Sequence, residues 1–130
     1  MEYKFRIWDG IKIFYQDDIN WIDFKNGYVS VLDEYNYADN CAKEISIGEF
    51  NLTQFTGKKD MKGKEIYTKD IVRCTNPSGR VLIGEIKFKY GYYGVESDLK
   101  VVPLANILSP EIEVIGNMYE NEGLLNKWEG

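Results

Sequence analysis

The stretch that decides the fold runs from residue 66 to residue 90 and reads Ile-Tyr-Thr-Lys-Asp-Ile-Val-Arg-Cys-Thr-Asn-Pro-Ser-Gly-Arg-Val-Leu-Ile-Gly-Glu-Ile-Lys-Phe-Lys-Tyr. Its middle, residues 76–79, is typical of a turn, because proline fixes its own φ and glycine adopts conformations closed to other residues. Residues 81–90 alternate, which is typical of a strand. Residues 66–73 favour another strand, which the chain enters at Asp70. The stretch therefore predicts two strands joined by a turn.

Further turn signals lie on both sides of this stretch. Asp-Gly and Asn-Gly supply the positive φ angles that a tight hairpin turn requires. They separate short segments that alternate between apolar and polar residues, or that carry short apolar groups. The predicted elements outside residues 66–90 are strands at 3–8 and 11–15 around Asp9-Gly10, strands at 19–24 and 28–32 around residues 25–27, apolar groups at 45–55, a turn at 60–63, strands at 99–102 and 112–115, and a short C-terminal helix with Asn121 at its N-cap.

Turn signals about every ten residues are typical of a barrel or a sandwich. Asp70-Ile-Val, followed by the turn and by residues 79–84, resembles the start of the meander in small SH3-like barrels. We therefore expect a mainly β (β-rich α+β) fold with antiparallel strands, an SH3-like partly open barrel and a short C-terminal helix. At 130 residues the chain is expected to be a single domain, with a strand-rich part at 1–54, a barrel-like core at 55–117 and the helix at 118–130.

The composition places the chain among soluble globular proteins. Hydrophobic residues make up 44% and charged residues 28%. Charges interrupt the apolar runs at the N-terminus, and no stretch approaches the roughly 20 apolar residues of a membrane helix. We therefore expect no membrane partner and a location in the cytoplasm. Cys41 and Cys74 form no CxxC pair and are expected to be reduced thiols in or near the core, with a disulfide or a reactive thiol as the alternative.

The chain contains no histidine, and so lacks the usual general base near neutral pH and the commonest transition-metal ligand. We predict no cofactor and no catalytic residue, and the chain is not expected to be an enzyme. A carboxylate-based enzyme is the least favoured alternative. It would use Glu111 and Glu113, which would point to the same side of a strand, as the acid and base pair of glycoside hydrolysis does. An exposed acidic strand face explains the pair better.

Three other segments carry a partial signal for ligand binding. Residues 33–44 are acidic but lack the spacing of a calcium loop, and we predict a loop with one helical turn. Gly91-Tyr-Tyr-Gly94 lacks the spacing of a phosphate-binding loop and is expected to form a tight turn. Lys62-Gly63-Lys64 is not preceded by the first glycine of a P-loop, so nucleotide binding has no support.

Residues 53–72 read Thr-Gln-Phe-Thr-Gly-Lys-Lys-Asp-Met-Lys-Gly-Lys-Glu-Ile-Tyr-Thr-Lys-Asp-Ile-Val. This block is similar to the central motif of the YopX family of phage and prophage proteins. Residues 113–121, Glu-Val-Ile-Gly-Asn-Met-Tyr-Glu-Asn, resemble its closing motif, and residues 4–9 fit its N-terminal pattern. Two positions depart from the family pattern. Thr68-Lys69 stands where the family often has Glu-Gly, so the backbone of this turn has less conformational freedom. Glu122 stands where the family often has proline.

The resemblance implies a β-rich fold of phage or prophage origin and implies no known activity. We assign structural roles to the motif residues. Gly57 and Gly63 suit positive φ, Asp70 can accept backbone N–H bonds, and Gly57 and Gly116 should tolerate alanine poorly if their φ is positive. The motif residues are Thr56, Gly57, Asp60, Gly63, Lys64, Glu65, Ile66, Tyr67, Asp70, Ile71, Val72, Glu113, Val114, Ile115, Gly116, Asn117, Tyr119, Glu120 and Asn121.

The middle of this acidic chain is basic. Residues 58–100 hold ten basic and six acidic side chains, whereas the whole chain has a net charge of −5. Lysines contact phosphates and aromatic rings stack on bases, so this segment is a candidate nucleic-acid surface. Against this, the lysines near residue 88 would lie on the strand face opposite the aromatic residues, and the pI is about 4.8. The candidate residues are Lys58, Lys59, Lys62, Lys64, Lys87, Lys89 and Tyr90.

Two functional hypotheses follow from the sequence. The first is a non-catalytic accessory protein that binds a protein partner or itself, because strand-rich domains with exposed edges and many tyrosines suit protein interfaces. The second is nucleic-acid binding through residues 58–90.

Overall fold

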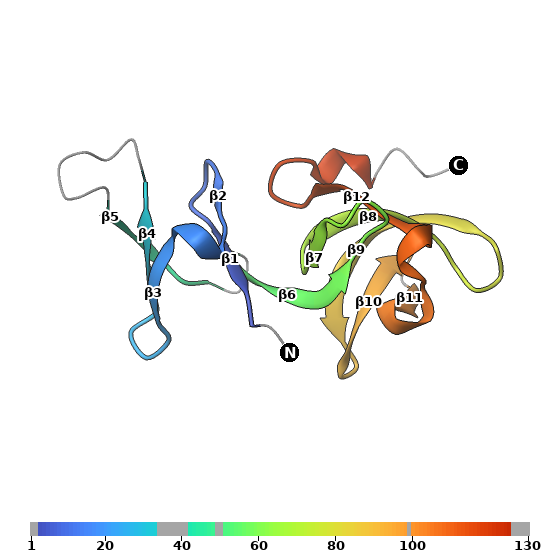
Figure 1. Cartoon of the computed structure of the whole chain (residues 1–130), viewed down its shortest axis with the longest axis horizontal. Helices are drawn as coiled ribbons and strands as arrows, with labels where there is room; N and C mark the ends of the chain where they lie inside the picture. The colour runs from blue at the N-terminus through green and yellow to red at the C-terminus, as the bar shows by residue number, and fades with distance from the viewer. Residues whose placement is uncertain (1–2, 34–41, 49–50, 99, 126–130) are drawn as a thin grey trace. The chain divides into compact units, whose positions relative to one another are not determined.

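The computed structural model describes residues 3–33, 42–48, 51–98 and 100–125, and the chain divides into two compact units (Figure 1). The first unit comprises residues 3–54 and the second begins at Phe55. Strand β6 (Leu52–Lys59) takes part in both units. Its first residues pair with β1 (Phe5–Trp8), and its last residues pair with β7 (Glu65–Tyr67). Cys41, which is expected to be a reduced thiol, lies outside the described residues, as do residues 34–41 of the predicted acidic loop. Residues 42–44, also predicted to belong to that loop, lie in a strand instead.

The first unit is built from short antiparallel strands. Strand β1 lies between β2 and β6, and a separate three-stranded sheet has the order β3-β4-β5. The Asp9-Gly10 turn is confirmed, because Asp9 Oδ1 accepts hydrogen bonds from the amides of Ile11 (2.7 Å) and Lys12 (2.8 Å). The elements after β1 are β2 (Ile13–Phe14), the 3₁₀ turn η1 (Gln16–Asp18), β3 (Ile19–Asp23), β4 (Tyr28–Leu32) and β5 (Ala42–Ser46).

The core of the first unit is apolar with one buried cation at its edge. Ile7, Val29 and Val31 are fully buried. Arg6, which the strand pattern places on the polar side, is also buried, and its Nε donates to Thr53 Oγ1 at 3.0 Å. A buried arginine needs such partners because an unpaired charge is costly in the interior.

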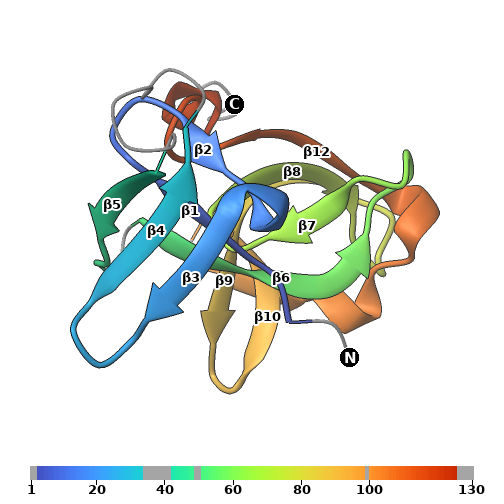
Figure 2. The same ribbon diagram turned by 60° about the vertical axis from the view of Figure 1, so that its left-hand side comes forward.

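The second unit contains a five-stranded antiparallel sheet with the order β11-β10-β9-β8-β12. The sheet curls into a partly open barrel (Figure 2). The mainly β, antiparallel, partly open barrel predicted from residues 66–90 is confirmed. The remaining elements are β8 (Asp70–Thr75), β9 (Val81–Lys89), β10 (Tyr92–Ser97), β11 (Lys100–Pro103), the 3₁₀ turns η3 (Leu104–Asn106) and η4 (Ser109–Glu111), β12 (Ile112–Asn117) and the 3₁₀ turn η5 (Glu122–Leu124).

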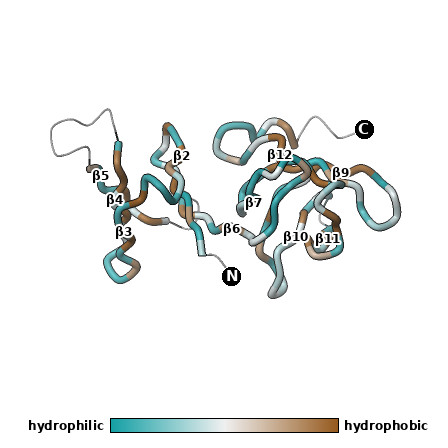
Figure 3. The backbone as a smooth tube through the Cα atoms, in the orientation of Figure 1, coloured by the Kyte–Doolittle hydropathy of each residue, from teal (hydrophilic) through white to brown (hydrophobic). Residues whose placement is uncertain are grey.

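One face of this sheet forms the core. Val72, Cys74 and Ile86 lie on the same face of the sheet and belong to one buried cluster. Hydrophobic and hydrophilic residues are interspersed along the strands (Figure 3). Burial raises the pKa of the Cys74 thiol to about 11. The predicted turn at 76–79 is confirmed, because Asn76 Oδ1 accepts hydrogen bonds from the amides of Ser78 and Arg80. Gly79 has a φ of 84°, which the turn requires.

At the C-terminal end the predicted helix is wrong, and the positive φ considered for Gly116 is not observed. The helix predicted within 118–130 is reduced, in its described part, to the 3₁₀ turn Glu122–Leu124. Asn121 precedes this turn, but its side chain does not cap it and instead accepts a hydrogen bond from the Asn117 amide (3.2 Å). Gly116 does not have a positive φ. A Cβ at Gly116 would lie 2.7 Å from Asn121 Oδ1, so close approach is what requires glycine there.

We expect Gly116→Ala to lower the free energy of unfolding by about 1–3 kcal/mol, because the new methyl group would overlap the Asn121 side chain. Gly123→Ala is the matched control, since nothing lies within 4 Å of a Cβ at that position. Chemical denaturation of the two variants checks this. Equal stability of both variants would show that the Asn121 side chain simply moves aside.

Candidate functional site

The buried carboxylate of Asp60 connects the β6–β7 turn to β12 in the second unit. Its Oδ1 accepts hydrogen bonds from the amides of Lys62 and Lys64, both at 2.9 Å, and closes the turn between β6 and β7. Its Oδ2 accepts a hydrogen bond from the Val114 amide in β12, also at 2.9 Å. The Met61 amide donates to the Ile112 carbonyl beside it. The turn is thereby fastened along the edge of β12.

Electrostatics favour the ionised form of Asp60. Burial alone raises the pKa of this carboxyl, but the amides of Val114, Lys64 and Lys62 donate hydrogen bonds to it and the Lys64 charge lies nearby. Together these interactions hold the pKa of Asp60 below its usual value. A carboxylate that accepts several backbone N–H bonds has this behaviour in general.

Other motif residues also make contacts within the second unit. Asp70 Oδ2 accepts a hydrogen bond from the Tyr67 amide (2.8 Å), and Thr56 Oγ1 donates to the Ile66 carbonyl (2.8 Å). Asn117 Oδ1 accepts hydrogen bonds from the amides of Tyr119 and Glu120. Its Nδ2 donates to the Glu120 carboxylate.

The rest of the motif lies in the core or in turns. Gly57 and Gly63 have φ values of 89° and 78°, as expected. Ile66, Tyr67, Ile71 and Val72 are buried, whereas Glu65, Val114 and Ile115 are half-buried. Lys69 stands where the family often has glycine and adopts a left-handed φ of 73°. Its amide and carbonyl hydrogen bond to Ile86 and Met118, which hold this conformation.

Several candidate nucleic-acid lysines contact groups of the protein itself. Lys58 Nζ donates to the carbonyls of Leu104 (3.0 Å) and Ile107, and burial lowers the pKa of this amine. Lys62 Nζ lies 2.8 Å from Glu113, whose second oxygen accepts from Arg73. The hydrogen bond from Lys62 is the main reason that the pKa of Glu113 is lowered.

The lysines of β9 share one carboxylate on the neighbouring strand. Lys87 Nζ and Lys89 Nζ lie 2.8 and 2.7 Å from the two oxygens of Glu96 in β10. These hydrogen bonds lower the pKa of Glu96 and raise that of Lys89. Lys59 and Lys64 are exposed in the β6–β7 hairpin, so the candidate lysines are not gathered into one surface by shared contacts.

The β9–β10 hairpin projects from the sheet (Figure 2). We call its residues 87–93 the aromatic arm, because four of them are aromatic. Phe88 is 61% exposed and Tyr90 is 75% exposed. The turn lies at Tyr90-Gly91 and not across the predicted residues 91–94, because Tyr92 already belongs to β10. Tyr90 and Gly91 both have positive φ (57° and 83°), as a type I′ turn requires.

The rings of the aromatic arm contact one another. Phe88 and Tyr93 form an edge-to-face pair with centroids 5.0 Å apart, and the rings of Tyr90 and Tyr92 lie 6.4 Å apart. Lys89 Nζ lies 5.8 Å from the centre of the Tyr90 ring. The arm thus presents several apolar rings beside a positive charge.

A second apolar surface lies on the outer face of the β3-β4-β5 sheet. Val29 and Val31 point into the core, so Tyr28, Ser30 and Leu32 of the same strand point away from it. Trp21 lies opposite Ser30 in the register. Trp21, Tyr28 and Leu32 are each more than 40% exposed. Sequence reasoning missed this outer face, although the alternation around Val29 and Val31 could have indicated it.

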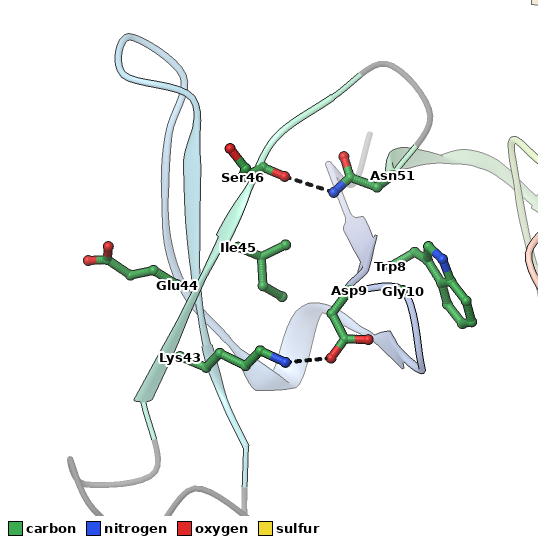
Figure 4. Close-up of a pocket in the computed structure, with 8 residues that line it drawn as sticks. All are labelled: Trp8, Asp9, Gly10, Lys43, Glu44, Ile45, Ser46 and Asn51. Carbon is green, nitrogen blue, oxygen red and sulfur yellow. Dashed lines mark hydrogen bonds and ion pairs between the residues drawn. The ribbon is translucent and has the colours of Figure 1, made fainter.

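The first unit also contains a cleft of about 390 Å³ (Figure 4). Polar groups of its lining bind one another. Lys43 Nζ lies 2.7 Å from Asp9 Oδ2, and Asn51 Nδ2 donates to the Ser46 carbonyl at 2.8 Å. The lining residues are Trp8, Asp9, Gly10, Lys43, Glu44, Ile45, Ser46 and Asn51.

Within the described residues, no group of three or more histidine, cysteine or acidic side chains could hold a metal ion. In the same part of the chain, no helix has the length and apolarity to cross a membrane.

Residues 4–126 match the YopX protein family. The chain belongs to the YopX family. A curated relative, the SPbeta prophage-derived uncharacterized protein YopX of Bacillus subtilis (strain 168), is 29% identical over 133 residues, which cover 96% of this chain and 97% of that protein. The family resemblance carried by residues 4–9, 53–72 and 113–121 is therefore confirmed.

Solved structures share the YopX fold. The crystal structure of protein yopX from Bacillus subtilis matches with a TM-score of 0.61 at 28% identity, over 94% of this chain and 97% of that one. The crystal structure of protein EF1440 from Enterococcus faecalis matches with a TM-score of 0.59 at 24% identity, over 96% and 99% of the two chains. The second likeness concerns the fold alone.

We expect Asp60→Asn to lower the free energy of unfolding by about 2 kcal/mol near neutral pH. The amide nitrogen of the asparagine would face a backbone N–H group whose hydrogen bond the carboxylate oxygen accepts in the wild type. Ionised Asp60 stabilises the wild type above the unfolded-state pKa of about 4, and this contribution is lost as pH falls through the lower folded-state pKa. The variant should lack that acid-side loss.

The measurement is urea denaturation of both proteins between neutral and strongly acidic pH. Glu111→Gln, at an exposed position, is the control and should change stability by less than about 0.5 kcal/mol. An Asp60→Asn variant with the stability and pH profile of the wild type would contradict this role of Asp60.

Proposed function

We propose that this chain is a non-catalytic phage or prophage accessory protein that acts in the bacterial cytoplasm by binding protein, either another molecule or itself. The observation that carries the proposal is the display of exposed rings on the aromatic arm, with Phe88 at 61% and Tyr90 at 75% exposure. Protein interfaces are enriched in tyrosine, tryptophan and phenylalanine. Binding energy at such interfaces is concentrated in a few aromatic and arginine side chains.

The backbone at the tip of the arm supports the proposal. Tyr90 occupies a left-handed conformation with a φ of 57°, which is unfavourable for a bulky residue by roughly 1–2 kcal/mol. Asparagine or glycine would fit this turn position at lower cost. A residue that weakens the fold and leaves its ring in solvent is better explained by contact with a partner than by stability.

The state of the charged groups also supports a binding role over catalysis. Asp60 holds backbone amides, Glu113 pairs with Lys62 and Arg73, and Glu96 pairs with two lysines. These acids are occupied by structural partners and are not aimed together at a cavity. The name of the Bacillus subtilis relative supports the prophage assignment and gives no activity.

Replacing Tyr90 with a photo-crosslinking phenylalanine analogue should give covalent adducts with protein when host cells carrying the phage genes are irradiated. The same analogue at Ser78, an exposed turn residue on another hairpin, is the control and should give few adducts. Mass spectrometry identifies the adducts. No protein adduct at position 90, or equal adducts at both positions, would sink the proposed function.

A second candidate function is single-stranded nucleic-acid binding by the aromatic arm. The observation that favours it is the position of Lys89 Nζ, 5.8 Å from the exposed Tyr90 ring, since stacking and cationic contacts are combined in such sites. Against it, Glu96 binds both Lys87 and Lys89, so the arm offers less positive charge than its sequence suggests.

Titration of labelled single-stranded DNA and RNA at low and at physiological salt separates the two candidates. We expect flat titrations, because the lysines of the arm already have a carboxylate partner. Binding that weakens steeply with salt, and that Lys87→Gln with Lys89→Gln abolishes, would instead establish the second candidate. Glutamine is preferred to glutamate because two more acids beside Glu96 would repel it.

A further inference from the structure

The aromatic arm and the outer face of the β3-β4-β5 sheet are two exposed apolar surfaces of different charge. We infer that the protein partner is a second copy of this chain, with the aromatic arm of one molecule docked on the outer face of the other. The inference rests on the proposed function and names its partner.

The aromatic arm has a positive surplus. Lys87 and Lys89 both lie on the outward side of β9, and they share the single carboxylate of Glu96. The pair therefore leaves one positive charge uncompensated. Lys89 Nζ lies 5.8 Å from the centre of the exposed Tyr90 ring, and Lys89 lies opposite Tyr92 in the register, whereas Phe88 is on the other face of the hairpin.

The outer face has a negative surplus. The register places Asp23 opposite Tyr28, and Glu44 opposite Ser30, on the side away from the core. None of the residues that the described strands place on this face is basic. In register order they are Trp21, Asp23, Tyr28, Ser30, Leu32, Ala42, Glu44 and Ser46. The outer face therefore combines aromatic and acidic residues, whereas the arm combines aromatic residues with a positive charge.

Charge also selects the mode of association. An arm-to-arm contact would bring two lysine pairs together, and a face-to-face contact would bring together two sets of carboxylates. Like charges placed opposite one another at an interface are unfavourable. A contact between arm and face pairs opposite charges and buries the rings of both. Such a contact is heterologous, so it can continue into a ring or a chain of molecules.

Complementation between two variants tests the inference. The arm variant carries Phe88→Ser and Tyr90→Asn, because asparagine tolerates the positive φ of the turn. The face variant carries Trp21→Thr and Tyr28→Thr, which keep strand-forming residues in β3 and β4. Sedimentation velocity over a wide range of protein concentration, at low and high salt, measures association.

We expect the wild type to self-associate, and we expect added salt to weaken this association. Each variant alone should associate at least about tenfold more weakly, since it has lost one of the two surfaces. Mixed together, the variants should form a heterodimer that grows no further, because only one arm and one face remain intact. Ile11→Thr, which removes an exposed apolar side chain outside both surfaces, should leave association unchanged.

A wild type that stays monomeric at all concentrations overturns the inference. So does a mixture that stays monomeric while the wild type associates, because the intact arm of one variant and the intact face of the other should then still bind. A face variant or an arm variant that associates alone as strongly as the wild type indicates arm-to-arm or face-to-face contact, and also overturns the inference. Far-UV circular dichroism confirms that the variants fold, and Tyr90→Asn alone replaces the arm variant if the double substitution unfolds. A monomeric wild type whose position-90 analogue crosslinks to a different protein would leave the proposed function standing.

Discussion

The barrel of the second unit depends on one buried carboxylate. Asp60 is 5% exposed and accepts three backbone N–H bonds, two from its own turn and one from Val114, which lies 54 residues further along the chain. The last of these bonds fastens the β6–β7 turn to the edge of β12. That edge would otherwise present unpaired backbone groups, which promote non-specific strand pairing. One side chain therefore orders a turn, protects a strand edge and links the two ends of the barrel sequence.

The local parts of this fold could be predicted from the sequence and the long-range parts could not. The residue types at Asp9-Gly10 and Asn76–Gly79 predict the two turns, and the alternation around residue 86 predicts the half-buried strand β9. The bond from Asp60 to Val114 leaves no periodic trace. The predicted short helix is wrong for a related reason. Asn121 is a good N-cap by type, but its side chain accepts a hydrogen bond from the Asn117 amide and lies close to Gly116 instead. Residue type predicts what a side chain can do, whereas the fold decides which partner it meets.

The charges of the middle segment illustrate the same limit. Ten basic side chains in residues 58–100 indicate a basic face when they are counted along the chain. In the folded unit the amine of Lys58 lies against backbone carbonyls, and three other lysines meet Glu113 or Glu96. Ion pairs of this exposed kind contribute little to stability, about 0–1 kcal/mol each. Their main effect is on the surface field, because each pair removes positive charge that an anionic ligand could use. Local excess charge in a sequence is therefore weak evidence for an anion-binding surface.

Among the described residues, three that are not glycine have a left-handed backbone: Lys69, Tyr90 and Asp98. Lys69 and Tyr90 show the difference between strain that the fold requires and strain that the fold does not explain. Lys69 is held by hydrogen bonds to the Ile86 carbonyl and from the Met118 amide, so its conformation joins β8, β9 and the segment after β12. Its strain is offset by the contacts that it makes possible. Tyr90 stands at an exposed hairpin tip, where a smaller residue would form the same turn with less strain. Its ring contacts Tyr92, yet three-quarters of its surface remains in solvent. Burial of the ring within the monomer therefore offsets little of the strain at Tyr90, and under the proposed function the ring would be buried on binding.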